Sequence, residues 1–158
     1  MTELVQILTG TLGTIGFGIL YNLRGKKLLL GAIGGLLGWS IFLALQPLVA
    51  SESIRYLFCA MGITVYAEIF ARIEKAPTTV FLAPSVIPLV PGSSLYYTMN
   101  YALNSQWEAF AQKALYTLEL VFFMAVGIIA ITTLTRVLTM IRKKLTKDSD
   151  LSHFHAVK

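Results

Sequence analysis

The sequence is poor in charged residues. Asp, Glu, Lys and Arg make up 13% of its 158 residues, while hydrophobic residues make up 56%. A soluble domain carries about 25% charged residues, so this chain cannot cover a globular surface with charge. We therefore predict that most of its surface faces lipid or partner helices. A transmembrane helix takes about 20 residues, which leaves room for five such helices and no soluble domain.

Cysteine and histidine are also scarce. Cys59 is the only cysteine, which excludes a disulfide framework and a cysteine-based metal site. We interpret it as a small packing residue. No histidine lies in an apolar stretch, and neither a Ser/His/Asp set nor a phosphate-binding loop is present. We therefore predict no enzyme activity, no metal and no cofactor. His153 and His155 could bind a metal, but two histidines on a polar tail are more simply solvated.

Apolar stretches alternate with short polar breaks along the whole chain. This pattern predicts an all-α, polytopic membrane protein of about five transmembrane helices. The predicted spans cover residues 2–21, 28–49, 54–71, 78–99 and 114–135. Together they form a membrane domain over residues 1–141, with a polar connection at residues 100–113. Residues 142–158 are predicted to form a basic cytoplasmic tail.

The positions of the basic residues predict how the chain is oriented in the membrane. Eleven Lys and Arg residues fall in the first loop, the third loop and the tail, and two, Arg55 and Lys113, fall in the other loops. Cytoplasmic loops carry the excess of Lys and Arg. We therefore predict an N-terminus outside the cell and a C-terminus in the cytoplasm. The net charge of +5 reflects this bias, and we predict no binding to nucleic acid.

Two predicted spans carry a stripe of glycines. Helices in lipid associate through close backbone contacts, which small residues permit. We interpret both stripes as packing surfaces, and a glycine-lined substrate path stays open as the alternative. The glycines are Gly10, Gly13, Gly16 and Gly18 in the first span and Gly31, Gly34, Gly35 and Gly38 in the second.

The fourth predicted span contains three prolines within eight residues, Pro84, Pro88 and Pro91. Proline lacks an N–H group and clashes with the carbonyl four residues earlier, so we predict a break near the membrane midplane. Irregular backbone at that depth is tolerated only inside protein or beside a water-filled cavity. A kinked packing helix is the alternative.

A second half-helix is predicted to begin just after the break. A serine could cap it, and its free N–H groups and positive dipole end could hold an anion. Transporters use such broken helices to bind anionic substrates near the midplane. We therefore predict a substrate-binding site made of Pro84, Ser85, Pro88, Pro91, Gly92, Ser93 and Ser94.

Two carboxylates lie inside predicted spans and are candidates for proton coupling. Glu119 is about six residues into the fifth span, where a lone carboxylate should be protonated or face a cavity. Alternatively, it is hydrogen-bonded near the headgroups through Tyr116 or Thr117. Glu68 lies four residues before Arg72, and the alternative for it is an ion pair reaching the interface.

Two segments carry a resemblance to a known family. Residues 67–72 (AEIFAR) followed by residues 84–96 (PSVIPLVPGSSLY) resemble the C-terminal half of the ThrE-type threonine/serine exporters. Residues 16–22 and 34–39 are similar to the first two helices of that family. The likeness extends to about residue 140. The family includes single-chain members and two-subunit members, and this chain resembles the small subunit.

The resemblance implies a subunit of a secondary exporter that moves small carboxylate solutes such as threonine or serine out of the cell. We predict that Glu119 or Glu68 couples this export to protons. The implied partner is a larger membrane subunit of the same family, and a homo-oligomer stays open. Split relatives have also been linked to succinate export, so a dicarboxylate exporter subunit is one alternative. A non-transporting scaffold for the larger partner is the other. The implied location is the inner (plasma) membrane, in contact with the lipid bilayer.

Overall fold

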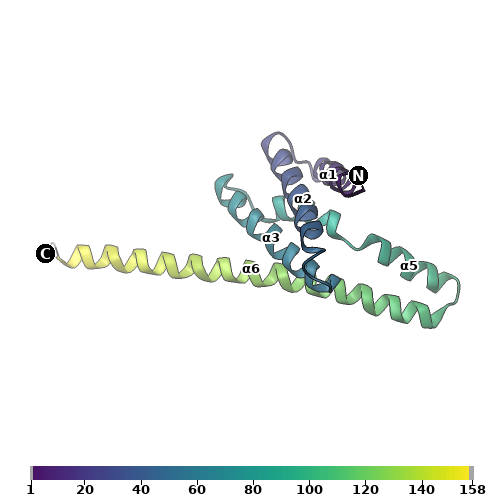
Figure 1. The fold of residues 1–158 in the computed structure, drawn as a ribbon. Helices are drawn as coiled ribbons and strands as arrows, with labels where there is room; N and C mark the ends of the chain where they lie inside the picture. Colours follow the sequence, from purple (N-terminus) through teal and green to yellow (C-terminus); the bar gives the residue numbers. More distant parts are fainter. Residues whose placement is uncertain (1, 157–158) are drawn as a thin grey trace.

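The computed structural model describes the backbone of residues 2–156 and the side chains of residues 3–142 and 144. All regular structure in this part of the chain is helical, which confirms the predicted all-α class. The elements are α1 (Thr2–Leu20), α2 (Lys26–Leu45), α3 (Glu52–Ile73), α4 (Thr79–Val86), the 3₁₀ turn η1 (Ile87–Leu89), α5 (Gly92–Leu103) and α6 (Trp107–Ala156) (Figure 1).

Four of the helices are long and apolar enough to cross a membrane, namely α1, α2, α3 and the first 36 residues of α6. Helices α4 and α5 are long and apolar enough only when they are taken together with η1 as one segment. This segment bends by 58° at the break between η1 and α5. The described residues thus hold four such helices, or five spans where the bent pair is counted as one. Both counts fit the multi-pass membrane protein of about five spans that the sequence predicts.

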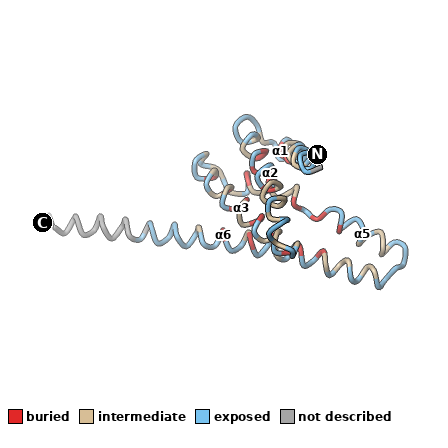
Figure 2. Tube along the Cα trace, in the orientation of Figure 1, coloured by how far each residue is buried: buried red, intermediate tan, exposed pale blue. Residues whose placement is uncertain are grey.

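The helices pack around α2 and α3, and α6 lies against α3. Helix α3 makes the most extensive contact with α6, while α2 packs against α1, α3 and α4. Helix α5 turns away from this group and runs back along the N-terminal part of α6, so the two form a projecting arm (Figure 1). Buried residues gather where α3 packs against α2, α4 and α6, and most of the arm is exposed (Figure 2).

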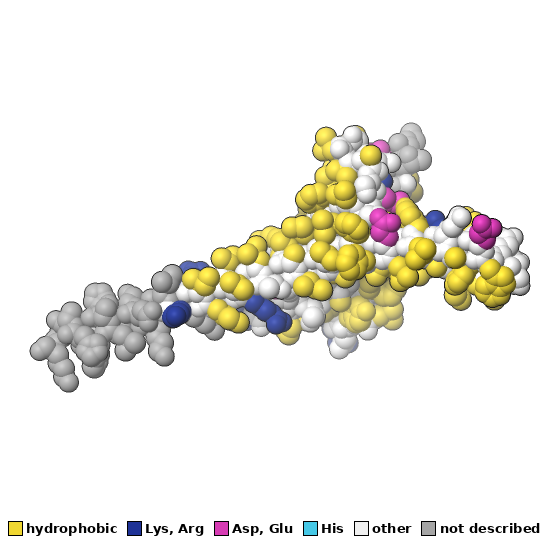
Figure 3. Space-filling view, turned by 90° about the horizontal axis from the view of Figure 1, so that it is seen from below, with side chains coloured by type: hydrophobic (Ala, Val, Ile, Leu, Met, Phe, Trp, Pro, Cys, Tyr) yellow, Lys and Arg dark blue, Asp and Glu magenta, His cyan; other side chains and the backbone are white. Residues whose placement is uncertain are grey.

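The main core lies between α3 and α6 and is closed by η1. Its buried members are Tyr56, Cys59, Ala60, Ile63, Leu89, Leu120 and Met124. The thiol of Cys59 is fully buried and donates a hydrogen bond of 2.8 Å to the carbonyl of Gly38. Outside this core, large apolar side chains are exposed over much of the surface (Figure 3). Such a surface matches a lipid environment, as the low charge content predicted.

The glycines of α2 confirm the predicted packing role. A Cβ atom added to Gly34 would collide with the side chain of Ser85, and one added to Gly35 would collide with Thr14. A Cβ atom added to Gly38 would lie 2.4 Å from the side chain of Ile63. Helix α2 can therefore approach α1, α3 and α4 only because these positions have no side chain.

The glycines of α1 match the packing prediction only in part. Gly10 lies beside Pro88, and a Cβ at Gly18 would meet Leu28 at 2.6 Å. Gly13 and Gly16, by contrast, have nothing within 4 Å of an added Cβ. The face of α1 that carries them is open among the described residues.

The polar connection predicted at residues 100–113 is mostly helical. Helix α5 continues to Leu103 and α6 begins at Trp107, so only three residues join them. The side chain of Asn104 donates a 2.9 Å hydrogen bond to the carbonyl of Asn100 and ends α5, and Ser105 takes a left-handed conformation with φ of 56°. Glu108 then favours helix at the positive end of the α6 dipole.

Two other predicted boundaries change. Helix α2 ends at Leu45, four residues before the predicted end of the second span. Helix α6 runs on to Ala156, so the backbone of the predicted tail continues the fifth helix. Lys and Arg are good helix formers, and no proline interrupts them. The side chains of His153 and His155 lie outside the described part of the chain.

Candidate functional site

The predicted break in the fourth span is present. Helix α4 ends at Val86, η1 follows, and the backbone becomes extended at Val90 before α5 begins at Gly92. Pro91 is the residue that precedes α5, and its ring prevents η1 from continuing into α5. The break therefore arises where the clustered prolines predicted it.

The predicted serine cap of α5 is absent. The capping position is taken by Pro91, whose side chain has no acceptor, and no side chain caps the helix. Ser93 and Ser94 lie inside the first turn, beyond the position where a hydroxyl can cap. The first bond of the helix joins the N–H of Leu95 to the carbonyl of Pro91 at 3.0 Å. The N–H groups of Ser93 and Ser94 therefore have no acceptor within the helix.

The structure divides the seven predicted binding residues into two groups. Pro84 and Ser85 are buried against α2, and the hydroxyl of Ser85 lies 2.7 Å from the carbonyl of Phe81 and 3.3 Å from that of Gly31. These residues hold two helices together, and the hydroxyl proton of Ser85 already has acceptors within the protein. The others lie at the break, where Gly92 and Ser93 are exposed, Pro88 is partly exposed, and Pro91 and Ser94 are buried.

A small cavity of about 310 Å³ adjoins the break. The cavity lies between α1, α2 and η1 and is lined by Gln6, Thr9, Gly10, Gly13, Trp39, Ile87 and Pro88. Of these residues, Trp39 has a buried indole nitrogen without a hydrogen-bond partner among the described residues.

A larger cavity, of about 580 Å³, lies where the ends of α3 and α4 meet α6. Ligand sites commonly measure about 300–1,000 Å³. We call it the inner cavity, because the predicted orientation places it at the cytoplasmic end. It is lined by Glu68, Arg72, Pro77, Thr78, Thr79, Leu82, Thr132, Thr135, Arg136, Thr139 and Met140.

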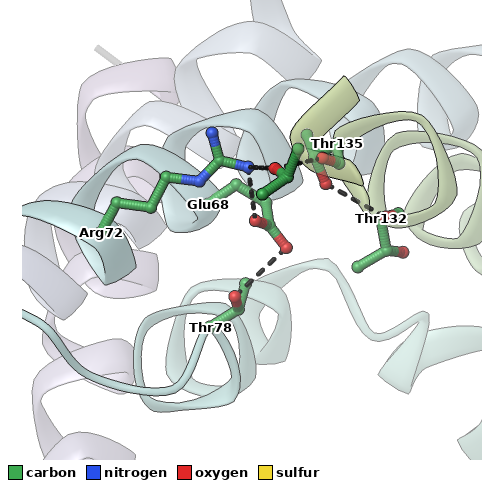
Figure 4. Close-up of polar contacts among 6 residues, drawn as sticks. Glu68, Arg72, Thr78, Thr132 and Thr135 are labelled. Atoms are coloured by element: carbon green, nitrogen blue, oxygen red, sulfur yellow. Dashed lines mark hydrogen bonds and ion pairs between the residues drawn. The ribbon is translucent and has the colours of Figure 1, made fainter. Parts of the chain in front are cut away.

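Glu68 is the most buried charge in the inner cavity, with 14% of its side chain exposed against 58% for Arg72. Thr78 donates a 3.1 Å hydrogen bond to its Oε1 atom, and Nη2 of Arg72 lies 3.7 Å from its Oε2 atom (Figure 4). Arg72 also donates to the hydroxyl of Thr139 at 3.2 Å. The ion pair considered from the sequence is therefore present, and it ties α3 to both α4 and α6.

Sequence reasoning missed the wall of this cavity that α6 provides. Thr132, Thr135, Arg136 and Thr139 are spaced three and four residues apart, so they share one face of the helix. This polar stripe near the end of an apolar helix was the signal that could have revealed them.

Glu119 lies at the opposite end of the α3–α6 contact. Its Oε1 atom accepts a 2.7 Å hydrogen bond from the hydroxyl of Ser53 at the start of α3. Tyr116 donates to Glu52 beside it. The neighbouring-helix partner considered from the sequence is thus present, but it is Ser53 rather than Tyr116 or Thr117. The rest of Glu119 is exposed.

Comparison with known families identifies the family to which the chain belongs. Residues 6–134 match the model of the family described as Threonine/Serine exporter, ThrE. The chain belongs to this threonine/serine exporter family. No curated protein and no solved structure matches it significantly.

The family match fits the membrane architecture of this exporter protein. It covers α1 to α5, the break and most of the apolar part of α6. Glu68, Glu119 and the residues of the break all lie within the match, whereas Thr135 and Arg136 follow directly after it. Family and fold together identify a multi-pass cell-membrane protein of a transporter class.

Proposed function

We propose that this chain is the small subunit of a two-subunit secondary exporter that moves small carboxylate solutes, such as threonine and serine, out of the cell. The observation that carries the proposal is the exposed N-terminal end of α5 in the broken span. There, Gly92 and Ser93 are exposed and no side chain caps the helix.

The chemistry of this helix end supports carboxylate binding. The N–H groups of Ser93 and Ser94 point out of the first turn, and the helix dipole adds partial positive charge at the same place. A carboxylate accepts hydrogen bonds from such groups without a basic side chain. The hydroxyl of Ser93 adds a further donor. This is the arrangement by which half-helices hold anionic substrates in other transporters.

The same exposure supports a partner subunit. Unpaired N–H groups facing lipid cost several kcal/mol each, so another protein surface should cover the start of α5. The larger subunit of the family would supply it. If that subunit starts in the cytoplasm and also has five spans, it is inverted relative to this chain, and a site between them lies near the midplane.

Glu119 and Glu68 are the proposed proton-coupling groups. Both lie on spans and both touch a neighbouring helix, Glu119 through Ser53 and Glu68 through Thr78. Protonation of either carboxylate would weaken an interhelical contact, which is how a proton can favour one helix arrangement over another.

Efflux measurements test the proposal. Cells loaded with labelled threonine, serine and succinate would express this chain alone, the larger subunit alone, or both. We expect rapid efflux of threonine and serine only when both are present. Efflux of succinate alone would support the dicarboxylate alternative. Equal efflux with the larger subunit alone would support the scaffold alternative and contradict the proposal.

A substitution at the helix end tests the site itself. Ser93→Leu should reduce efflux at least about tenfold, since it removes a donor and fills the space in front of the N–H groups. Ser51→Leu is the matched control, because Ser51 is also exposed, precedes a helix and makes no capping bond. Unimpaired efflux in Ser93→Leu would count against this site.

A further inference from the structure

We propose that the inner cavity binds one zwitterionic amino acid, with Arg136 holding its carboxylate and Glu68 its ammonium group. This site would load substrate from the cytoplasm before it reaches the break. The inference rests on the proposed function and adds a second site, with its own residues, to it.

The charges of the cavity wall favour a monocarboxylate. Among the lining residues Glu68 is negative, and Arg72 and Arg136 are positive. Arg72 is already engaged by Glu68 and Thr139. Arg136 is exposed and makes no hydrogen bond or ion pair with the side chains that the structure describes. One guanidinium therefore remains to take a carboxylate, which it can bind through two parallel hydrogen bonds.

The threonine hydroxyls of α6 present acceptors to the cavity. Thr132 donates its proton to the carbonyl of Ile128, Thr135 to that of Thr132 at 3.0 Å, and Thr139 to that of Thr135 at 2.7 Å. A hydroxyl has only one proton to donate. The oxygen lone pairs left on these hydroxyls can only accept hydrogen bonds. Together with Glu68, they form a wall that suits a ligand rich in donors (Figure 4).

This wall distinguishes between the candidate substrates. Threonine and serine carry an ammonium group with three donors and a hydroxyl with one. Ionised succinate has acceptors only, so it finds no partner on the threonine wall, and the carboxylate of Glu68 repels it. The cavity therefore favours hydroxy amino acids over dicarboxylates.

The position of the cavity suits a loading site. Thr78 and Thr79 line the cavity, and α4 runs from them to the break. An eight-residue helix is about 12 Å long. A solute released from the cavity would thus need to travel only about one short helix length to reach the exposed start of α5.

Ligand binding to the full-length chain in lipid nanodiscs tests this inference. Isothermal titration calorimetry would compare L-threonine, 3-hydroxybutyrate (threonine without its amino group) and succinate. We expect Glu68→Gln to weaken threonine binding at least about tenfold, since a charged hydrogen bond is lost. The same change should not weaken 3-hydroxybutyrate binding, because that ligand has no ammonium group and loses only the repulsion from the carboxylate. Arg136→Gln should weaken both ligands. A merely structural role for Glu68 would weaken both ligands equally in Glu68→Gln, and that result would overturn the proposal.

Matched controls remove the same charges outside the cavity. Glu74→Gln changes a carboxylate just after the same helix, and Arg24→Gln changes an exposed arginine in a loop at the same predicted membrane face. Both should bind threonine like the unaltered chain. Failure of the unaltered chain to bind threonine would also overturn the proposal. Threonine binding by Glu68→Gln as tight as that of the unaltered chain would refute this site. If the two unaltered subunits together still export threonine, the proposed function stands.

A lipid headgroup offers the same pair of charges, because phosphatidylethanolamine carries an ammonium and a phosphate. Nanodiscs of phosphatidylglycerol with and without phosphatidylethanolamine separate the two sources. We expect threonine to bind in both. Retention of phosphatidylethanolamine by the unaltered chain but not by Glu68→Gln, with no threonine binding, would assign the cavity to lipid and overturn the proposal.

Discussion

The hydroxyl of Ser53 donates a 2.7 Å hydrogen bond to Glu119, joining the start of α3 to a point on α6 that is 66 residues later in the chain. At the other end of the same helix pair, Arg72 of α3 donates to Thr139 of α6. Helices α3 and α6 are therefore joined by polar contacts at both ends and by an apolar core between them. The carboxylates proposed to take part in transport, Glu119 and Glu68, lie at these two ends.

Replacement of Glu119 by glutamine should separate proton coupling from folding. The amide oxygen of glutamine can still accept the hydrogen bond from Ser53, so we expect normal protein levels in the membrane. Efflux driven by a pH gradient should fall at least about tenfold, because an amide cannot carry the proton. Efflux assays with and without a gradient measure this, with Glu108→Gln at the exposed start of α6 as the control. Gradient-dependent efflux in Glu119→Gln would exclude Glu119 as the proton carrier.

The glycine positions predict a sharp contrast between the first two helices. Gly35→Ala should destabilise the chain by about 1–3 kcal/mol, because the added methyl group collides with Thr14 in a close-packed contact. Gly13→Ala should be neutral or slightly stabilising, because its Cβ meets open space and alanine favours helix. Thermal unfolding in detergent compares the two variants. Equal stability would show that α1 and α2 do not pack as described.

The break should depend on Pro91. Pro91→Ala supplies an N–H group and removes the ring that separates η1 from α5, so the two half-helices can join more directly. We expect efflux to fall at least about tenfold while the protein remains in the membrane, since a joined helix consumes the free N–H groups at the start of α5. Pro47→Ala, in the turn after α2, is the control. Full efflux in Pro91→Ala would show that the break is not needed.

Thiol labelling tests the predicted orientation. Cys59 is fully buried, so the natural chain should not react with a membrane-impermeant maleimide. In sealed right-side-out vesicles, Leu48→Cys should react at once, because Leu48 is 79% exposed just after α2, whose C-terminal end is predicted to face outside. Arg24→Cys should react only after the vesicles are opened. The reverse pattern would show that the chain is inverted.

The sequence predicted the parts of the fold that depend on local chemistry. Hydropathy located the spans, and Pro88 and Pro91 located the break, because proline disturbs the helix in which it lies. Pro84, by contrast, is accommodated inside α4. The spacing of Gly34 and Gly38 predicted a packing face because both residues belong to one helix. In each case the cause and the effect lie within a few residues of each other.

The features that were missed depend on contacts between distant segments. The partner of Glu119 is far away in sequence, and either hydroxyl neighbour on its own helix was an equally reasonable choice. The inner cavity needs α3, α4 and α6 together, and a threonine such as Thr132 looks like an ordinary span residue until the third helix is placed. Local polarity predicted a polar connection at residues 100–113 but did not show that it is mostly helical, because α5 and α6 stabilise each other there.

The length of α6 has a mechanical consequence. Fifty residues of helix extend for about 75 Å, more than twice the roughly 30 Å thickness of the hydrocarbon layer. Near the middle of its apolar part, Gly127 lies so close to α3 that an added Cβ would be 2.6 Å from the carbonyl of Leu57. A stiff rod supported near this point moves its two ends in opposite directions when it tilts. Widening the space between α3 and α6 at one end would therefore narrow it at the other, without any loop having to move.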